Sequence, residues 1–238
     1  MNIMDDKDQS IIAHLEELRR VLIKCFASIG IMLPVCLWLS PKCLDALVRF
    51  LIKGQDISLN FFSPMGVFVL QLKLALLMSV LLAFPYIAKN MWDFILPALY
   101  DKERKFLGRA VFYSSTLFIG GVLFCFFVIL PMIINFGMGF STDEIKPVFE
   151  INNVVNLSLW LSFAFGIMFQ VPLITNMLIK WGVVSYAAVS EKRPYVITGL
   201  LIIAALLTPP DVISQIMLFL PTYMLFEAGL FFSVSKKN

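Results

Sequence analysis

The sequence predicts an all-α polytopic membrane protein with six transmembrane helices, and three observations support this fold class. Of its 238 residues, 60% are hydrophobic and only 15% are charged, against about 25% charged in a typical soluble domain. The mean hydropathy is +0.88. Long runs without charged residues recur, and a membrane-spanning helix needs about 20 apolar residues. The predicted spans cover residues 21–40, 65–88, 107–133, 151–179, 194–208 and 212–232, within a single integral membrane domain over residues 1–238.

The first two spans each accommodate one lysine. The apolar run that begins at Cys25 is too short to cross a membrane, so the first helix is predicted to begin near Val21, with Lys24 reaching toward the membrane surface. The second span is interrupted only by Lys73. Between these spans, Leu44–Leu51 has the apolar spacing of a short amphipathic helix, which is predicted to lie on the outer membrane surface.

The third and fourth spans are long, whereas the fifth is short. Pro194–Pro210 contains about 17 residues, or roughly 25 Å of helix, against a hydrocarbon core of about 30 Å. The sequence TPPD at Thr208–Asp211 then allows only a tight turn before the sixth helix. Helices five and six are therefore predicted to form a hairpin that is shorter than the full membrane.

Proline recurs within or beside the spans. Each proline removes a backbone hydrogen bond and bends its helix, a change that neighbouring helices can accommodate in a membrane. Bent helices predict a concave wall. The prolines concerned are Pro34, Pro85, Pro131, Pro172 and Pro221.

The distribution of lysine and arginine predicts the orientation, because positively charged loops stay in the cytoplasm. With the N-terminus inside, most of the 19 basic residues fall on the cytoplasmic side, and both termini are cytoplasmic. The net charge of +3 reflects this bias and does not indicate nucleic-acid binding. The cytoplasmic set is Lys7, Arg19, Arg20, Lys24, Lys89, Lys102, Arg104, Lys105, Arg109, Lys180, Lys192, Arg193, Lys236 and Lys237.

The sequence indicates neither an enzyme nor a cofactor-binding protein. It has no glycine-rich loop of the type that cradles nucleotide phosphates. Its four cysteines form no CxxC pattern and no cluster with histidine, so we expect no metal site and no disulfide. The single histidine, His14, is expected to be a surface residue on the polar side of an apolar stripe. That stripe consists of Ile11, Leu15, Leu18 and Leu22.

Among the residues of the predicted spans, four with charged or amide side chains are candidates for a role beyond packing. Such groups are costly in hydrocarbon and usually face a protein interior or a wet cavity. They are expected either to pair with one another, which would stabilise the helix bundle, or to meet a polar residue on the helix of another protein. These residues are Lys73, Gln170, Gln215 and Glu227.

Two acidic and two basic residues lie in the sequence HLEELRR, His14–Arg20, directly before the first span. On a helix, Glu16 and Arg20 are four residues apart in the favourable order for an ion pair, and Glu17 can reach Arg20 at three. The spacing alone predicts a solvated, ion-paired helix face.

Several motifs taken in order resemble those of the TatC family, the receptor subunits of the twin-arginine protein translocase. The resemblance extends over essentially the whole chain and includes the six-span plan. It implies a component that recognises signal peptides with paired arginines and helps to move folded proteins across a membrane. The motifs are HLEELRR, WDFILPALYDKERK (Trp92–Lys105), KRPYV (Lys192–Val196), LLTPPDVISQ (Leu206–Gln215) and LFEAGLFFS (Leu225–Ser233).

The resemblance implies that Glu17 and Glu103 bind the signal peptide. Consecutive side chains of an extended peptide point to opposite sides, so two separated carboxylates can each take one guanidinium. Each contact can be bidentate, which lysine cannot copy. Arg19 is expected to hold a carboxylate in place, and Phe94 to pack against the apolar residues that follow the arginine pair.

The resemblance also implies docking positions for single-span partner proteins of the TatA and TatB type. These positions are Thr208 and Gln215 on the hairpin and Gln170 on the fourth span, where many relatives carry glutamate. A glutamine can hydrogen-bond a partner but cannot change charge. The implied assembly is a multimeric complex in the bacterial plasma membrane, with transport driven by the proton-motive force. The alternative is a secondary transporter of a small solute with Lys73, Gln170 and Glu227 around its site, although no internal repeat supports it.

Overall fold

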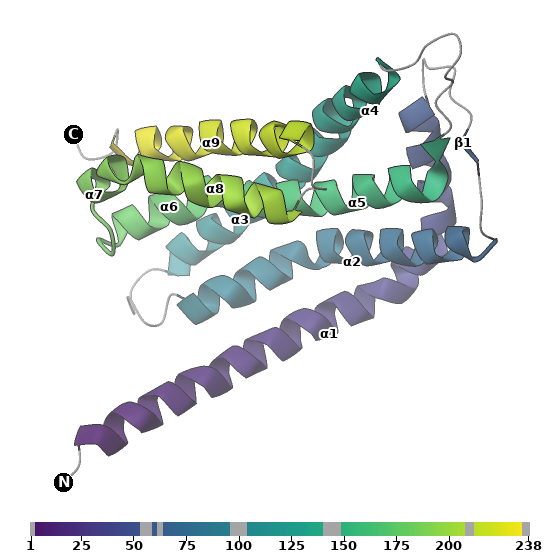
Figure 1. Ribbon diagram of the computed structural model, residues 1–238. Coiled ribbons are helices and arrows are strands. Elements are labelled where there is room, and N and C mark those ends of the chain that lie inside the picture. Colours follow the sequence, from purple (N-terminus) through teal and green to yellow (C-terminus); the bar gives the residue numbers. More distant parts are fainter. Residues whose placement is uncertain are drawn as a thin grey trace.

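The computed structural model describes residues 3–52, 59–60, 64–95, 104–139, 149–207 and 212–234, and within them the chain is almost entirely helical (Figure 1). The predicted all-α fold class is therefore confirmed. The elements are α1 (Ile3–Ile52), β1 (Leu59–Asn60), α2 (Pro64–Ile95), α3 (Arg104–Phe124), the π-helix η1 (Cys125–Ile129), α4 (Leu130–Met138), β2 (Phe149–Glu150), α5 (Ile151–Met168), α6 (Val171–Lys180), α7 (Tyr186–Glu191), α8 (Arg193–Leu207) and α9 (Val212–Val234).

Five helical stretches of the described chain are long and apolar enough to cross a membrane. They are His14–Leu51, Met65–Ile95, Leu107–Met138, Ile151–Lys180 and Val212–Phe231, and the apolar helix over Arg193–Leu206 is shorter. The short fifth helix matches the sequence-based expectation. The sixth differs from it, because the 23 residues of α9 extend to about 35 Å, more than the thickness of the hydrocarbon core.

Two of the five span prolines coincide with breaks in helical geometry. Pro131 stands two residues after the end of η1, in the first turn of α4. Pro172 stands in the first turn of α6, just after the turn at Phe169 and Gln170 that separates α6 from α5. A proline cannot donate to the carbonyl four residues earlier, so the preceding turn widens or opens. The other three, Pro34, Pro85 and Pro221, lie inside the continuous helices α1, α2 and α9.

The segment Leu44–Leu51 corrects the prediction of a separate surface helix. It is the last part of α1, and its apolar side chains Leu44, Leu47 and Leu51 are buried in the main hydrophobic core. An apolar stripe of helical period fits a membrane surface and a protein core equally well. In this chain, the stripe packs into the protein core. Figure 1 shows this end of α1 turning away from the direction of the rest of the helix.

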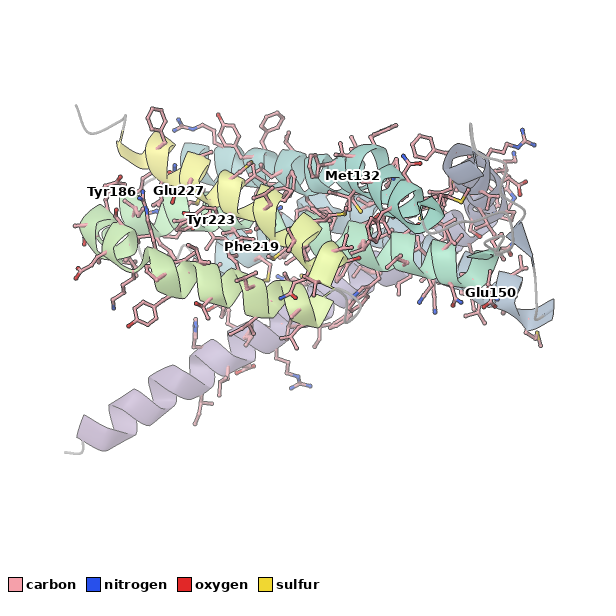
Figure 2. All side chains as sticks on the ribbon, turned by 45° about the horizontal axis from the view of Figure 1, so that its top comes forward. Met132, Glu150, Tyr186, Phe219, Tyr223 and Glu227 are labelled. Atoms are coloured by element: carbon pink, nitrogen blue, oxygen red, sulfur yellow. The ribbon has the colours of Figure 1, made fainter. Side chains whose placement is uncertain are left out.

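At one end of the bundle, two short strands pair in parallel. Leu59 of β1 lies opposite Phe149 of β2, and Asn60 lies opposite Glu150. At the other end of the bundle, Figure 1 places the first turn of α1 and the last turn of α9 on the same side. The N-terminal half of α1 diverges from the remaining helices (Figures 1 and 2).

The main core centres on α5, against which α1, α2, η1, α8 and α9 contribute buried residues, and much of the outside is apolar. Phe118 and Phe165 are almost fully buried, whereas Phe26, Trp38 and Phe231 are 71%, 78% and 71% exposed. Large apolar side chains facing outward over several long helices are what a lipid environment accepts. The chain is therefore a multi-pass membrane protein.

Candidate functional site

The charged segment before the first span forms the exposed part of α1. Arg20 donates from Nη2 to Oε1 of Glu16 at 2.8 Å, which confirms the ion pair predicted from the spacing. Both side chains are exposed, at 71% and 59%, so the pair contributes only a few tenths of a kcal/mol. Glu17 is exposed as well.

His14 contacts an aromatic residue that is 80 positions away in the sequence. Its ring stacks on that of Phe94 near the end of α2, with centroids 4.5 Å apart and an angle of 19° between the planes. The buried residues Val21 and Cys25 continue this face of α1 toward the core. At 100° per residue, Glu17 lies beside this face, next to the stacked rings.

The histidine contact was missed by sequence reasoning, which placed His14 on a plain polar surface. His14 is exposed, as expected, but it is also part of the contact between α1 and α2. The apolar stripe predicted nearby is only partly packed, since Leu15 and Leu22 are 58% and 43% exposed. No local signal could have identified Phe94 as the partner of His14, because the pairing depends on how the two helices cross.

The other two predicted peptide-binding residues are Arg19 and Glu103. Arg19 is exposed on α1, and its neighbour Arg20 is the residue that forms the ion pair with Glu16. Glu103 lies outside the described residues. The structure therefore brings Glu17 and Phe94 to the same end of the bundle.

Gln170 is held by Ser114 through two hydrogen bonds. The Ser114 hydroxyl donates to Oε1 of Gln170 at 2.7 Å, and Nε2 of Gln170 donates to the Ser114 carbonyl at 3.0 Å. A carboxylate at this position could accept the first bond, but it could not donate the second. The side-chain amide therefore suits the local pairing of α3 with the α5–α6 turn.

The other polar groups of the spans also bond within the chain. Lys73 donates to Oδ1 of Asn156 at 2.8 Å, which joins α2 to α5. Gln215 donates to the Leu201 carbonyl at 3.1 Å, which joins α9 to α8. Thr208 lies outside the described residues. Of the two arrangements considered for these groups, mutual pairing is therefore wrong for Lys73, whose partner is Asn156.

Glu227 forms a small polar cluster at the α8–α9 hairpin. Its Oε2 accepts from Nη2 of Arg193 at 3.0 Å, and its Oε1 accepts from the Tyr223 hydroxyl at 2.9 Å. Figure 2 shows Tyr223 and Glu227 on neighbouring turns of α9. Glu227 therefore pairs with Arg193 rather than with Lys73, and the pair links the first turn of α8 to α9.

Replacing Glu227 with glutamine is expected to lower the free energy of unfolding by about 0.5–1 kcal/mol, because the ion pair is lost while the shape is kept. The expected loss of stability is small because the side chains of Arg193 and Glu227 are 41% and 31% exposed, which weakens the ion pair. Thermal unfolding in detergent measures the change, with Glu191→Gln as the control on an exposed glutamate of α7. Arg193→Gln is also combined with Glu227→Gln. If the double variant loses as much stability as the two single variants together, the two residues are not directly coupled.

These observations define the class of the protein: a polytopic helical membrane protein with an exposed acidic and aromatic rim at one end. Comparison with known proteins narrows this class. The family described as Sec-independent protein translocase protein (TatC) matches residues 13–221. The TatC protein of Azotobacter chroococcum mcd 1 is 35% identical over 233 residues, covering 95% of this chain and 90% of the relative. That of Escherichia coli K12 is 33% identical over 234 residues, covering 94% and 88%.

Solved structures agree with the sequence comparison. Two crystal structures of the twin-arginine translocase receptor TatC, one of them in the detergent DDM, superpose with TM-scores of 0.85 and 0.84 at 28% identity. They cover 94% and 92% of this chain and 100% and 99% of their own chains. The chain belongs to the TatC family. It is a subunit of the Sec-independent, twin-arginine (Tat) protein translocase, and not a transporter of small solutes.

Membership of this family also bears on the partners and the class of the protein. As a component of a Tat translocase, the chain works together with other Tat subunits. Its relatives are named as translocase proteins and not as enzymes.

Proposed function

We propose that this chain is the signal-peptide receptor of its translocase and binds the two consecutive arginines through Glu17 and Glu103. The observation that carries the proposal is the exposed Glu17 carboxylate beside the stacked rings of His14 and Phe94. A carboxylate next to an apolar aromatic surface matches a peptide in which arginines precede apolar residues. Arg19 is proposed to orient one carboxylate, and Phe94 to pack against the apolar part of the peptide.

The charge around Glu103 restricts how recognition can work. Lys102, Arg104 and Lys105 surround Glu103 in the sequence, so the charge of this segment repels a cationic peptide on average. Attraction must then act at short range, through bidentate contacts between carboxylate and guanidinium. Selectivity for arginine over lysine follows from that geometry, because a compact ammonium group cannot form both hydrogen bonds in one plane.

Site-directed photo-crosslinking tests where the peptide binds. A photoreactive residue is placed at Ile12, which is 63% exposed near Glu17, or at Trp38, which is 78% exposed about 39 Å further along α1. A signal peptide with Arg-Arg is expected to crosslink at position 12 and not at position 38. A Lys-Lys peptide is expected to crosslink at neither. Equal crosslinking at both positions would contradict binding at the rim.

The complete assembly is proposed to include single-span proteins of the TatA and TatB type and further copies of this chain. Gln170, Thr208 and Gln215 are the proposed docking positions for the partner helices. The membrane is proposed to be the bacterial inner membrane, with both termini in the cytoplasm, in agreement with the distribution of basic residues. Transport is proposed to draw on the proton-motive force, which supplies about 2.3 kcal/mol per charge for each 100 mV.

Partner docking is testable at Gln215. Gln215→Leu is expected to reduce co-purification of the single-span partners several-fold, because the side-chain amide no longer offers a hydrogen bond in the membrane. The neighbouring Ile216→Leu is the control, since Ile216 is 51% exposed and remains apolar. Gln215 also bonds Leu201, so thermal unfolding of both variants is measured in parallel. Unchanged co-purification with Gln215→Leu would remove this residue from the docking site.

A further inference from the structure

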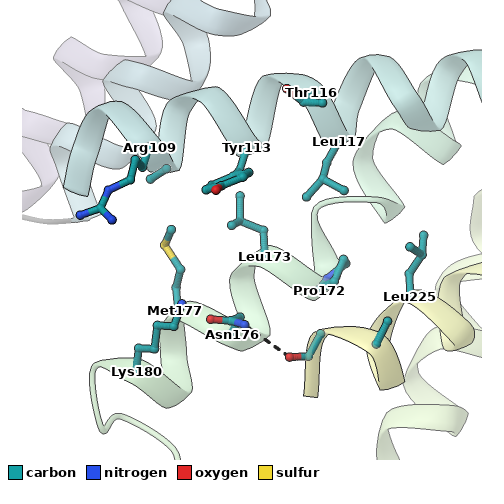
Figure 3. A pocket seen from close by; sticks show the side chains of 13 residues that line it. Arg109, Tyr113, Thr116, Leu117, Pro172, Leu173, Asn176, Met177, Lys180 and Leu225 are labelled. Atoms are coloured by element: carbon teal, nitrogen blue, oxygen red, sulfur yellow. Dashed lines mark hydrogen bonds between the residues drawn. The ribbon is translucent and has the colours of Figure 1, made fainter. Parts of the chain in front are cut away.

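A pocket of about 760 Å³ lies between α3, α6 and α9, apart from the rim residues discussed above (Figure 3). Its walls come from three helices that are distant in sequence. The lining includes Leu117 of α3, Leu173 of α6 and Leu225 of α9. The pocket is partly open to the outside of the bundle.

The lining of the pocket changes from charged to apolar along its length. Figure 3 shows Arg109 and Lys180 at one end and Leu117, Pro172 and Leu225 at the other. The two cationic residues also stand at the ends of membrane spans, since Arg109 is in the first turn of Leu107–Met138 and Lys180 is the last residue of Ile151–Lys180. The charged end therefore lies at the level of the lipid headgroups, and the apolar end points into the hydrocarbon.

Close packing of two helices forms one wall of the pocket. Asn176 of α6 donates to the Gly229 carbonyl of α9, with 3.4 Å between nitrogen and oxygen. A Cβ atom at Gly229 would lie 2.9 Å from Cα of Pro172, so the glycine allows α9 to approach the backbone of α6. The wall is thus part of the folded bundle, and a ligand would find the pocket already formed.

We propose that this pocket binds one anionic phospholipid, with its phosphate at Arg109 and Lys180 and the upper part of one acyl chain against Leu117, Pro172 and Leu225. Basic pockets between transmembrane helices are suited to anionic headgroups. Among the described residues that line this one, two are cationic and none is acidic. A volume of about 760 Å³ falls within the range of small-molecule sites, about 300–1,000 Å³. This proposal does not depend on the signal-peptide proposal.

Native mass spectrometry of the full-length protein tests the proposal. The purified protein is mixed with phosphatidylglycerol or phosphatidylcholine that carry identical acyl chains, and the retained lipid is compared. We expect phosphatidylglycerol to be preferred. Each cation near a headgroup contributes about 1 kcal/mol, so the double variant Arg109→Gln, Lys180→Gln is expected to reduce that preference about 25-fold. Inorganic phosphate at millimolar concentration is expected to leave lipid retention unchanged.

Two further variants separate the pocket from the general surface charge. Lys89→Gln removes an exposed cation of α2 outside the pocket and is expected to leave the lipid preference unchanged. Ala228→Phe places a ring in the pocket and is expected to weaken the retention of phosphatidylglycerol without changing the charge. An equal effect of Lys89→Gln, or an unchanged preference in the double variant, would overturn the proposal. So would a double variant that keeps its lipid but loses the single-span partners, since the pocket would then be a partner-helix site.

Discussion

Replacing Gly121 with alanine is expected to lower the free energy of unfolding by about 2–3 kcal/mol, because the added methyl group meets backbone atoms of the neighbouring helix. A Cβ atom at Gly121 of α3 would lie 2.6 Å from the Phe165 carbonyl oxygen and 2.9 Å from Cγ of Phe169. The nearest obstacle is backbone and cannot rotate away. The two helices would have to separate, and the contacts around Phe165 would be lost.

The adjacent glycine supplies a matched control. A Cβ atom at Gly120 meets nothing within 4 Å, so Gly120→Ala makes the same chemical change on the same helix without the clash. Thermal unfolding of both variants in detergent measures the difference. Equal transition temperatures for the two variants would show that the close approach of α3 to α5 does not limit stability.

A second close contact at the same helix crossing refines this prediction. A Cβ atom at Gly166 of α5 would lie 2.7 Å from the ring of Phe118, which is 1% exposed and stacks on Phe84 with centroids 3.7 Å apart. This obstacle is a side chain. Phe118→Leu is therefore expected to restore part of the stability lost in Gly166→Ala, but none of that lost in Gly121→Ala.

Replacing Glu17 with glutamine is expected to weaken binding of an Arg-Arg signal peptide about 30-fold. Hydrogen bonds to charged groups contribute about 1.5–3 kcal/mol, and glutamine keeps the shape of the side chain but loses its charge. Fluorescence anisotropy with a labelled peptide and the purified protein measures the affinity. A Lys-Lys peptide is expected to bind wild-type protein about as weakly as the Arg-Arg peptide binds Glu17→Gln.

Asp93→Asn is the control for this experiment. Asp93 is an exposed carboxylate next to Phe94, so its replacement removes a negative charge from the same end of the bundle. If recognition acts at short range, this variant changes the affinity less than about threefold, whereas Glu103→Gln matches Glu17→Gln. A similar loss in all three variants would indicate general acidity of the surface. No loss in Glu17→Gln would exclude Glu17 from the site.

The sequence allowed the fold class to be predicted well, because membrane spans are specified by local composition. A run of apolar residues must be helical in lipid, whatever its neighbours are. The effects of Pro131 and Pro172 could be predicted for the same local reason. Leu44–Leu51 was misassigned because the helical spacing of its apolar residues does not show whether they face a membrane surface or the protein core.

The candidate site was less predictable because its residues meet across helices. The stacking of His14 on Phe94 joins α1 to α2, and the bonds between Gln170 and Ser114 join α3 to the α5–α6 turn. Spacing identified the Glu16–Arg20 pair, which lies within one helical turn. The pairings between helices depend on crossing angles that one sequence does not contain. Spacing also could not single out Glu17, whose proposed role came from its resemblance to a family motif.

The length of α1 makes it a lever. Its C-terminal end is packed in the core by Leu44, Leu47 and Leu51, while His14 stands about 40 Å from Pro41 along the helix. Rotation of an arm of that length by 5° displaces its tip by roughly 3.5 Å. Such a displacement is close to the whole separation of the His14 and Phe94 rings, 4.5 Å. A small tilt of α1 is therefore enough to form or break the aromatic contact between His14 and Phe94 at the rim.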